Sequence, residues 1–253
     1  MGRKLLRAAV VLLGLAGVWQ LVVWASGVPP FILPGPLGVA QAIGAHADKL
    51  VANAWVTFAE IGLGLVLGSA LGVASALVLA HFRPARLWLM PVLVASQAVP
   101  VFALAPVLVL WLGYGIGSKV AMATLIIYFP VTVAFFDGLR RTEPGWLDLA
   151  HTMNAGRWRT LRQIRIPAAL PTLASGLRVA TAVAPIGAVV GEWVGSSRGL
   201  GYLMLHANAR MQIDLLFAAL TVLAVFSVLL YAAVDVCLRR ALPWQPDSIS
   251  IWE

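Results

Sequence analysis

Six long apolar runs limit the folds open to this chain. A helix needs roughly 20 apolar residues to cross a hydrocarbon layer about 30 Å thick. Runs of about that length or longer cover residues 6–25, 54–80, 87–112, 119–139, 172–195 and 215–237. They predict an all-α membrane protein with six transmembrane helices, in a single transmembrane domain that spans residues 1–253.

The composition is also typical of a membrane protein. Hydrophobic residues make up 61% of the sequence, whereas ordinary soluble domains hold roughly 45–50%. The net charge of +8 raises the possibility of a nucleic-acid partner. The charges, however, gather at the ends of the apolar runs, where anchoring to membrane lipid explains them more simply. We therefore expect membrane lipid, and no nucleic acid, as a partner.

The distribution of basic residues predicts an orientation. When the loops are assigned alternately to the two sides, fourteen of the 18 Lys and Arg residues fall on one side. Cytoplasmic loops carry such an excess. Both termini and the segment 140–171 are therefore expected in the cytoplasm. Basic residues precede the first run, as they precede the apolar core of a secretory signal. The length of this run and the presence of later runs favour a retained helix instead.

The sequence offers no catalytic constellation and no metal site. Its four histidines are scattered without ligand spacing. The stretch "GYGIGSK" at 113–119 departs from a phosphate-binding loop because Ser118 stands where that motif needs glycine. We expect no ATP site in this chain, so any ATP hydrolysis must belong to a partner.

The segment "TEPGWLDLAHTMNAGRWRTLRQIRIPAALP" predicts a helix–turn–helix elbow. Thr142 is a candidate cap for a first helix, and Asn154 is suited to the left-handed conformation that ends one. A second helix is expected from about Gly156 until Pro167 and Pro171 close the segment. Composition alone also allows a plain solvated basic loop, but apolar residues at steps of three and four favour a surface for a partner.

These residues resemble the EAA loop of ABC importer permeases, whose pattern is E-A-A, three residues, G, nine residues and I-x-L-P. Asp148, Leu149 and Ala150 stand for E-A-A, Asn154 falls at the glycine, and residues 164–167 fall at I-x-L-P. Asp keeps the charge and Asn keeps the turn, whereas Leu149 is bulkier than the usual alanine. The resemblance implies a coupling helix at about 144–154, with these ATPase-coupling residues: Trp146, Asp148, Leu149, Ala150, Met153, Asn154, Ile164 and Pro167.

Further stretches extend the resemblance over nearly the whole chain. "PPFILPGP", "PVLVASQAVPVFALAPVLVLWLGYGIGSK" and "GEWVGSSRGLGYLM" are similar to the permease branch for nitrate, taurine and aliphatic sulfonates. The resemblance implies the type I ABC importer permease fold in a bacterial inner membrane. It also implies two ABC ATPase subunits that use ATP and Mg, an extracytoplasmic binding protein and a second permease copy, with no cofactor in this chain.

Polar residues inside the apolar runs are candidates for the solute path. Glu60 and Glu192 qualify because carboxylates at membrane depth are costly, and Trp193 adds a stacking face. Ser96 and Gln97 place polar groups among the prolines of the third run. The acids and Gln97 have structural alternatives: the acids can stabilise the helices near the outer surface, and Gln97 can bind a freed carbonyl group.

The solute is inferred from these polar groups and from the resemblance. Sulfonate or nitrate needs positive donors, but the candidate path offers carboxylates, an amide and an indole. "AVPVFALAP" and "GAVVGEWVG" look most like permeases for hydroxymethylpyrimidine, a thiamine precursor. Import of taurine, aliphatic sulfonates or nitrate is the alternative. An ion-coupled secondary transporter and a membrane scaffold are more distant alternatives, because no inverted repeat is visible and both leave the loop spacing unexplained.

Overall fold

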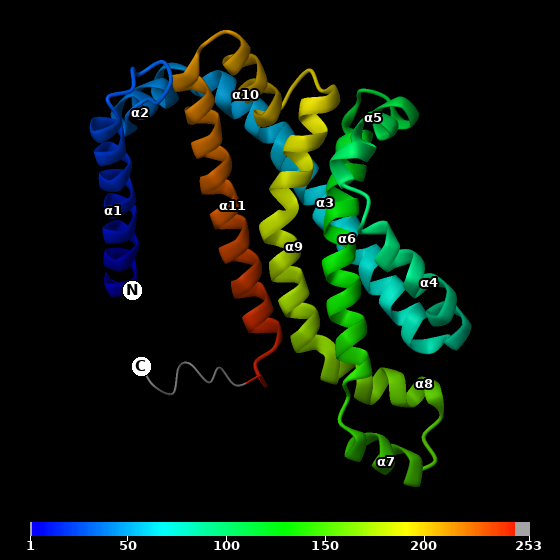
Figure 1. Ribbon diagram of the computed structural model, residues 1–253. Helices are drawn as coiled ribbons and strands as arrows, with labels where there is room; N and C mark the ends of the chain where they lie inside the picture. Colours follow the sequence, from blue (N-terminus) through cyan, green and yellow to red (C-terminus); the bar gives the residue numbers. More distant parts are fainter. Residues whose placement is uncertain (1, 246–253) are drawn as a thin grey trace. The chain divides into compact units, whose positions relative to one another are not determined.

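The computed structural model describes residues 2–245, except for the side chains of residues 2–5, 7–9 and 12. Within this range every regular element is helical (Figure 1). In chain order they are α1 (Gly2–Ser26), α2 (Pro36–Ala45), α3 (Ala47–His81), α4 (Arg83–Ser96), α5 (Val101–Leu112), α6 (Ile116–Arg140), α7 (Pro144–Thr152), α8 (Arg157–Thr160), the π-helix η1 (Leu161–Arg165), α9 (Ile166–Gly195), α10 (Leu200–Ala209) and α11 (Ile213–Ala241).

The helices form two compact units. One comprises Met1–Thr57 and Ser197–Val225, and the other comprises Phe58–Ser196 and Phe226–Glu253. The basic residues Arg3, Lys4 and Arg7 have side chains outside the described part, so the prediction that they anchor the first helix is not addressed by the structure.

Among the described residues, four continuous helices are long and apolar enough to cross a membrane: α3, α6, the helix Arg157–Gly195 and α11. The bent pair α4 and α5 makes a fifth when counted as one span. The first apolar run lies in α1, whose described apolar part, Leu13–Ser26, is shorter than these spans. The all-helical prediction is confirmed, whereas the described spans do not confirm the count of six.

The third apolar run is not one straight helix, as 87–112 predicts. It breaks between Ser96 and Val101, and the two halves diverge by 100°. Pro100 occupies the N-cap of α5, where its missing N–H costs nothing, and proline disfavours helical geometry in the residue before it. Pro91 and Pro106 stay inside α4 and α5. The position of a proline within the hydrogen-bond ladder, rather than its presence, decides where this run breaks.

The second unit is built around α6 and α9, which lie side by side (Figure 1). Gly64, Gly68 and Gly72 of α3 face α6, where an added Cβ would collide with Ala123, Ile127 and Tyr128–Val131 respectively. These glycines, which repeat at every fourth position, therefore allow α3 and α6 to pack closely.

The helix after Gly156 does not end at its prolines. It continues without a break through Pro167 and Pro171 to Gly195, for 39 residues in all. The π-helix Leu161–Arg165 ends two residues before Pro167, and the helix changes direction there (Figure 1). A wider turn relieves the clash of a proline ring with the preceding turn, which explains why the predicted stop did not occur.

An apolar cluster holds this bend against the rest of its unit. Leu161 of the π-helix is buried with Leu79 of α3 and Phe135, Phe136 and Leu139 of α6. Burial of such side chains contributes roughly 1.5–3 kcal/mol each. The base of the elbow is thereby fixed to α3 and α6.

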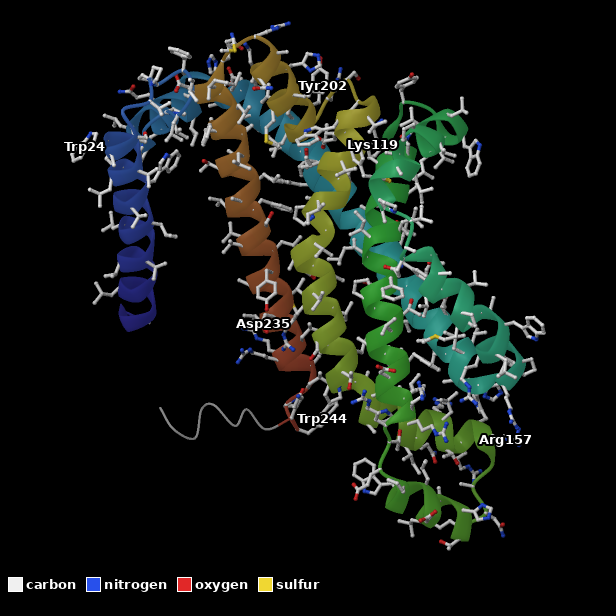
Figure 2. All side chains as sticks on the ribbon, in the orientation of Figure 1. Trp24, Lys119, Arg157, Tyr202, Asp235 and Trp244 are labelled. Atoms are coloured by element: carbon white, nitrogen blue, oxygen red, sulfur yellow. The ribbon has the colours of Figure 1, made fainter. Side chains whose placement is uncertain are left out.

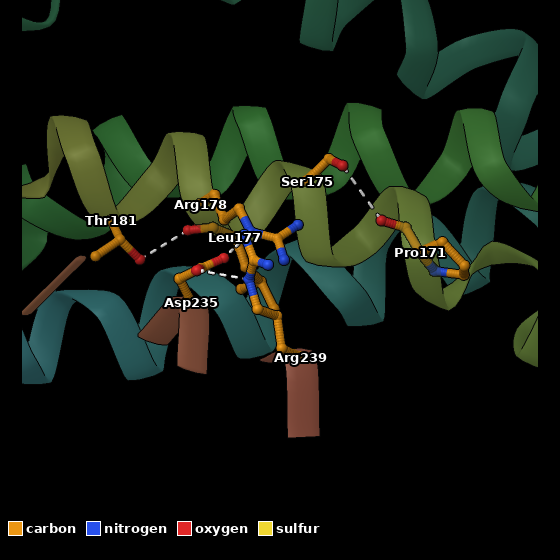
Figure 3. A network of polar contacts seen from close by, with 7 residues as sticks. All are labelled: Pro171, Ser175, Leu177, Arg178, Thr181, Asp235 and Arg239. Carbon is orange, nitrogen blue, oxygen red and sulfur yellow. Dashed lines mark hydrogen bonds and ion pairs between the residues drawn. The ribbon is translucent and has the colours of Figure 1, made fainter. Parts of the chain in front are cut away.

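A polar network joins α9 to the second half of α11 in the same unit (Figure 3). Asp235 accepts a hydrogen bond from Arg178 Nε at 2.7 Å and another from Arg239 Nε at 2.8 Å. One carboxylate thus links two arginines on two helices. Figure 2 shows Asp235 in the lower part of α11.

In the first unit, α3 holds the start of α10. Asn53 Oδ1 accepts the N–H of Gly199 at 2.8 Å, and Thr57 Oγ1 accepts the N–H of Leu200 at 2.7 Å. Free N–H groups at a helix start need such acceptors. Gly199 has a φ of 116°, which favours glycine at this turn.

Candidate functional site

The elbow expected between α6 and the next apolar helix is present as α7 and α8. Its first helix begins one residue later than its predicted cap requires. Glu143 is the N-cap of α7 and Pro144 is at the first helical position, which suits proline because its missing N–H has no partner there in any case. Thr142 instead donates its hydroxyl to Leu139 O at 3.3 Å. Thr142 therefore closes α6 and does not cap α7.

The end of α7 matches the predicted left-handed turn. Asn154 has a φ of 53°, its N–H donates to His151 O at 3.0 Å, and the N–H of Ala155 donates to Ala150 O at 2.9 Å. This pair of bonds is a Schellman motif, which satisfies the last carbonyl groups of a helix. Asn154 therefore performs the conformational task of the glycine in the EAA pattern.

An apolar groove adjoins α7 and gathers four of the predicted coupling residues. Trp146 and Leu149 of α7 line it together with Ile164 of the π-helix and Pro167 of α9. The groove measures about 640 Å³ and its lining also includes Trp244. Residues 15 or more positions apart in the sequence thus meet on one surface. No sequence pattern pointed to Trp244, since it lies after the last apolar run.

The other four predicted coupling residues lie outside this groove. Ala150 is buried against the chain, which fits the small residue expected there, while Asp148, Met153 and Asn154 are exposed. Met153 is 73% exposed and Trp146 is 51% exposed. Large apolar side chains that stay open on a short helix indicate a surface for a protein partner.

A second polar site lies inside the apolar part of the second unit. Glu60 of α3, Lys119 of α6 and Glu192 of α9 are each 1% exposed. The carboxyl groups of Glu60 and Glu192 lie close enough to interact with each other, and both acids interact with the charge of Lys119. The structure thus brings together two acids that are 132 positions apart in the sequence and adds a cation between their helices.

Lys119 also binds backbone carbonyl groups. Its Nζ donates to Tyr114 O at 2.6 Å, to Gly115 O at 3.0 Å and to Gly195 O. Gly195 is the last residue of α9, so Lys119 satisfies a free carbonyl at a helix end. Figure 2 shows Lys119 near the start of α6, beside the end of α9. Gly191 makes room for it, because an added Cβ would lie 3.1 Å from Lys119 Cα.

Lys119, the first residue of the run 119–139, was not among the predicted site residues. The signal that could have found it is a lysine at the very start of an apolar run, in a chain whose other apolar runs carry two acids that need a partner. The remaining path candidates lie elsewhere. Trp193 is 47% exposed, and Ser96 and Gln97 are exposed at the break between α4 and α5, where the Ser96 hydroxyl donates to Leu93 O at 2.7 Å.

Comparison with known proteins identifies relatives along nearly the full chain. A "Probable ABC transporter permease protein" of Haemophilus influenzae is 54% identical over 94% of this chain and 97% of its own length. The formylaminopyrimidine transport permease protein ThiX of Halalkalibacterium halodurans is 35% identical over 90% of this chain and 91% of its own length. The riboflavin transport system permease protein RibX of Chloroflexus aurantiacus is 37% identical over 93% of this chain and 89% of its own length. The "Putative aliphatic sulfonates transport permease protein SsuC" of Bacillus subtilis is 28% identical over 90% of this chain and 83% of its own length.

The fold also matches a solved transporter. A chain of the MetNI methionine ABC transporter, in an inward-facing conformation, superposes with a TM-score of 0.68 at 19% identity, covering 78% of this chain and 97% of its own. At that identity the match establishes the fold alone, which is that of a type I importer permease. The profile of one family, described as "Binding-protein-dependent transport system inner membrane component", matches residues 64–243. The chain therefore belongs to this family of ABC transporter permeases.

Proposed function

We propose that this permease works in an ATP-driven importer for a thiamine-precursor ring such as hydroxymethylpyrimidine. The observation that carries the mechanical part is the elbow α7–α8. Its exposed apolar side chains and the adjoining groove offer a surface that an ATPase can bind and release. Modest apolar contact suits an interface that opens and closes in each cycle.

The ATPase in this proposal is a partner, present in two copies, that uses ATP and Mg. The chain itself requires no cofactor. A second copy of the permease completes the transmembrane part, and an extracytoplasmic binding protein delivers the solute. Both termini and the elbow lie in the cytoplasm, as the distribution of basic residues supports.

The choice of solute is supported by chemistry and by one relative. The relative named for formylaminopyrimidine transport is 35% identical, whereas the one named for aliphatic sulfonates is 28% identical. The polar cluster in the apolar part of the second unit contains two carboxyl groups and one ammonium group. The ammonium group of Lys119 is already occupied by backbone carbonyl groups, so it offers little to an anionic solute. A neutral or cationic ring fits this balance better than a sulfonate.

The binding protein often sets specificity in such systems, so the test must include it. The experiment is uptake of labelled hydroxymethylpyrimidine into vesicles that contain this chain, its ATPase and its binding protein. Labelled taurine and labelled riboflavin serve as parallel solutes, and vesicles without ATP serve as the control. Uptake of the pyrimidine that requires ATP supports the whole proposal.

Other outcomes separate the parts of the proposal. ATP-dependent uptake of taurine or riboflavin instead keeps the importer and overturns the solute. Uptake that proceeds without ATP and follows an ion gradient overturns the mechanism and favours a secondary transporter.

A further inference from the structure

A strongly basic cavity lies on the other side of α7 from the apolar groove. It measures about 400 Å³ and lies between the end of α3, the start of α4, the elbow helices and the π-helix, all within one compact unit. Its polar lining consists largely of six basic side chains: His81, Arg83, Arg86, His151, Arg157 and Arg165. No acidic side chain lines it.

The arginines of this cavity are not neutralised within the described residues. The ion pairs found between residues 2 and 245 use Arg140, Arg178 and Arg239, and none uses an arginine of the cavity. The Nε atom of Arg165 is buried and has no hydrogen-bond partner. A buried donor without an acceptor is costly, and several unpaired positive charges around one space repel one another. An anion would remove both costs at once.

Other contacts hold the lining in place. The ring of His81 packs edge-on against the ring of Trp158, with centroids 5.8 Å apart and planes at 88°. The side chain of Thr160 donates to Gly156 O at 3.2 Å, which leaves the nearby basic groups as the donors that face the cavity. Because the lining comes from α3, α4, α7 and the π-helix, a ligand here would connect the elbow to the α3–α4 turn.

We propose that this cavity binds a phosphate-bearing anion. The planar guanidinium group matches phosphate oxygens in pairs, and several arginines around one site suit a group that carries more than one negative charge. A single carboxylate would leave most of the positive charge uncompensated. The proposal does not depend on which solute the transporter carries or on how the ATPase is coupled.

The position of the cavity favours the phosphate of an anionic lipid headgroup. The apolar helix α3 ends at His81 and α4 begins at Arg83, so the cavity opens where apolar surface gives way to charge. Phe82 and Leu87, adjacent to lining residues, are 55% and 63% exposed and offer contact for acyl chains. Basic pockets beside membrane helices on the cytoplasmic side bind anionic headgroups in this way.

Two probes distinguish a lipid from a free ion. The full chain, purified in detergent, is incubated with equal amounts of phosphatidylglycerol and phosphatidylcholine, and retained lipid is counted by native mass spectrometry. In parallel, binding of labelled inorganic phosphate is measured by equilibrium dialysis. The test variant carries Arg157→Gln and Arg165→Gln. The matched control carries Arg239→Gln and Arg240→Gln, which removes the same charge from the end of α11.

We expect the wild type and the control to retain phosphatidylglycerol over phosphatidylcholine. The test variant should bind it at least about tenfold more weakly, since each lost charge-assisted hydrogen bond removes affinity on that scale. Phosphate binding that is lost in the test variant, without lipid selectivity, also supports the site and assigns it to a free ion.

Equal behaviour of the wild type and the test variant toward both probes overturns the proposal. If the test variant then also fails to copurify with the ATPase, the cavity receives acidic side chains of that partner instead. Helix content and thermal unfolding establish that the variants fold. Should the test variant not fold, the pair Arg83→Gln and Arg86→Gln on α4 replaces it under the same criteria.

Discussion

Lys119 shows how much a single residue can hold together in an apolar environment. Its ammonium group meets backbone carbonyl groups from two segments and the charge of two acids. Two carboxyl groups in contact cannot both ionise without a strong cost, so the cation makes the burial of Glu60 and Glu192 tolerable. The cluster also connects α3, α6 and α9 and stays close to electrical balance.

Replacement of Lys119 by methionine should destabilise the protein strongly. Removal of one partner from a buried ionic group costs about 3–5 kcal/mol because the remaining charge is uncompensated. Thermal unfolding in detergent measures this effect. Addition of Glu192→Gln to Lys119→Met should recover part of the loss, and Lys49→Met, at an exposed lysine, should change little. An unaltered unfolding temperature for Lys119→Met would show that the cluster does not need its cation.

Asn154 is the residue on which the shape of the elbow depends. The left-handed conformation costs a non-glycine residue about 1–2 kcal/mol, and Asn adopts it more readily than most residues. The two hydrogen bonds of the Schellman motif at this turn fix where α7 stops. The direction in which the chain leaves α7 follows from this one φ value.

Asn154→Pro should uncouple transport from ATP hydrolysis and leave the membrane helices folded. Proline fixes φ near −65° and lacks the N–H that donates to His151 O, so the turn cannot form. Uptake should fall to background in reconstituted vesicles while ATP hydrolysis continues. Asn154→Gly, which keeps the turn, is the control and should transport normally. Normal uptake by the proline variant would exclude a coupling role for this turn.

At the scale of helices, close approach matters more than apolarity. α3 meets α6 along glycines at every fourth position, so the helix backbones can touch. This pattern was readable in the sequence because it repeats with the helix period. The pairing of α3 with α6, in contrast, had no signal in one sequence, since a small residue does not specify which neighbour it will face.

Gly68→Ala should weaken the packing of α3 on α6. The added Cβ would lie 2.8 Å from Ile127 Cβ and 3.0 Å from Thr124 O, and such overpacking costs about 1–3 kcal/mol. Gly62→Ala on the same helix is the matched control, because a Cβ there meets nothing within 4 Å. That variant should gain up to about 1 kcal/mol from helix propensity. Thermal unfolding of both in one detergent decides between packing and propensity, and equal effects would count against packing.

Proline is less predictable at this scale than glycine. Pro100 stands at the break between α4 and α5, whereas Pro167 and Pro171 lie inside a continuous helix, although all three lie in apolar or amphipathic sequence. The difference is tertiary: a π-helix and the buried Leu161 support the chain before Pro167. A single sequence shows where a proline stands but not what the surrounding helices provide to accommodate it.

For the molecule as a whole, long apolar runs and one spaced motif predicted the fold class and the elbow. Each rests on local periodicity that one sequence displays. The groove at Trp146, the basic cavity and the Lys119 cluster rest on contacts between distant segments. No periodicity encodes such contacts, so the individual acids were found and their arrangement was not.

The orientation of the whole chain can be tested with its one cysteine. Cys237 is exposed near the end of α11, which the basic residues predict to be cytoplasmic. A membrane-impermeant maleimide should label it in inside-out vesicles and not in intact right-side-out ones. With Cys237→Ser in place, Ser197→Cys should show the reverse pattern. Labelling of both positions from the same side would contradict the predicted topology.

The π-helix at Leu161–Arg165 has a consequence for motion. A π turn holds more residues than an α turn, and it interrupts an otherwise unbroken helix of 39 residues. Conversion of this turn to α geometry would rotate everything beyond it by about 100° and shift it by about 1.5 Å along the axis. Glu192 stands near the far end of that helix. A movement of the elbow that converts this turn would thus rotate and shift the opposite end of the helix.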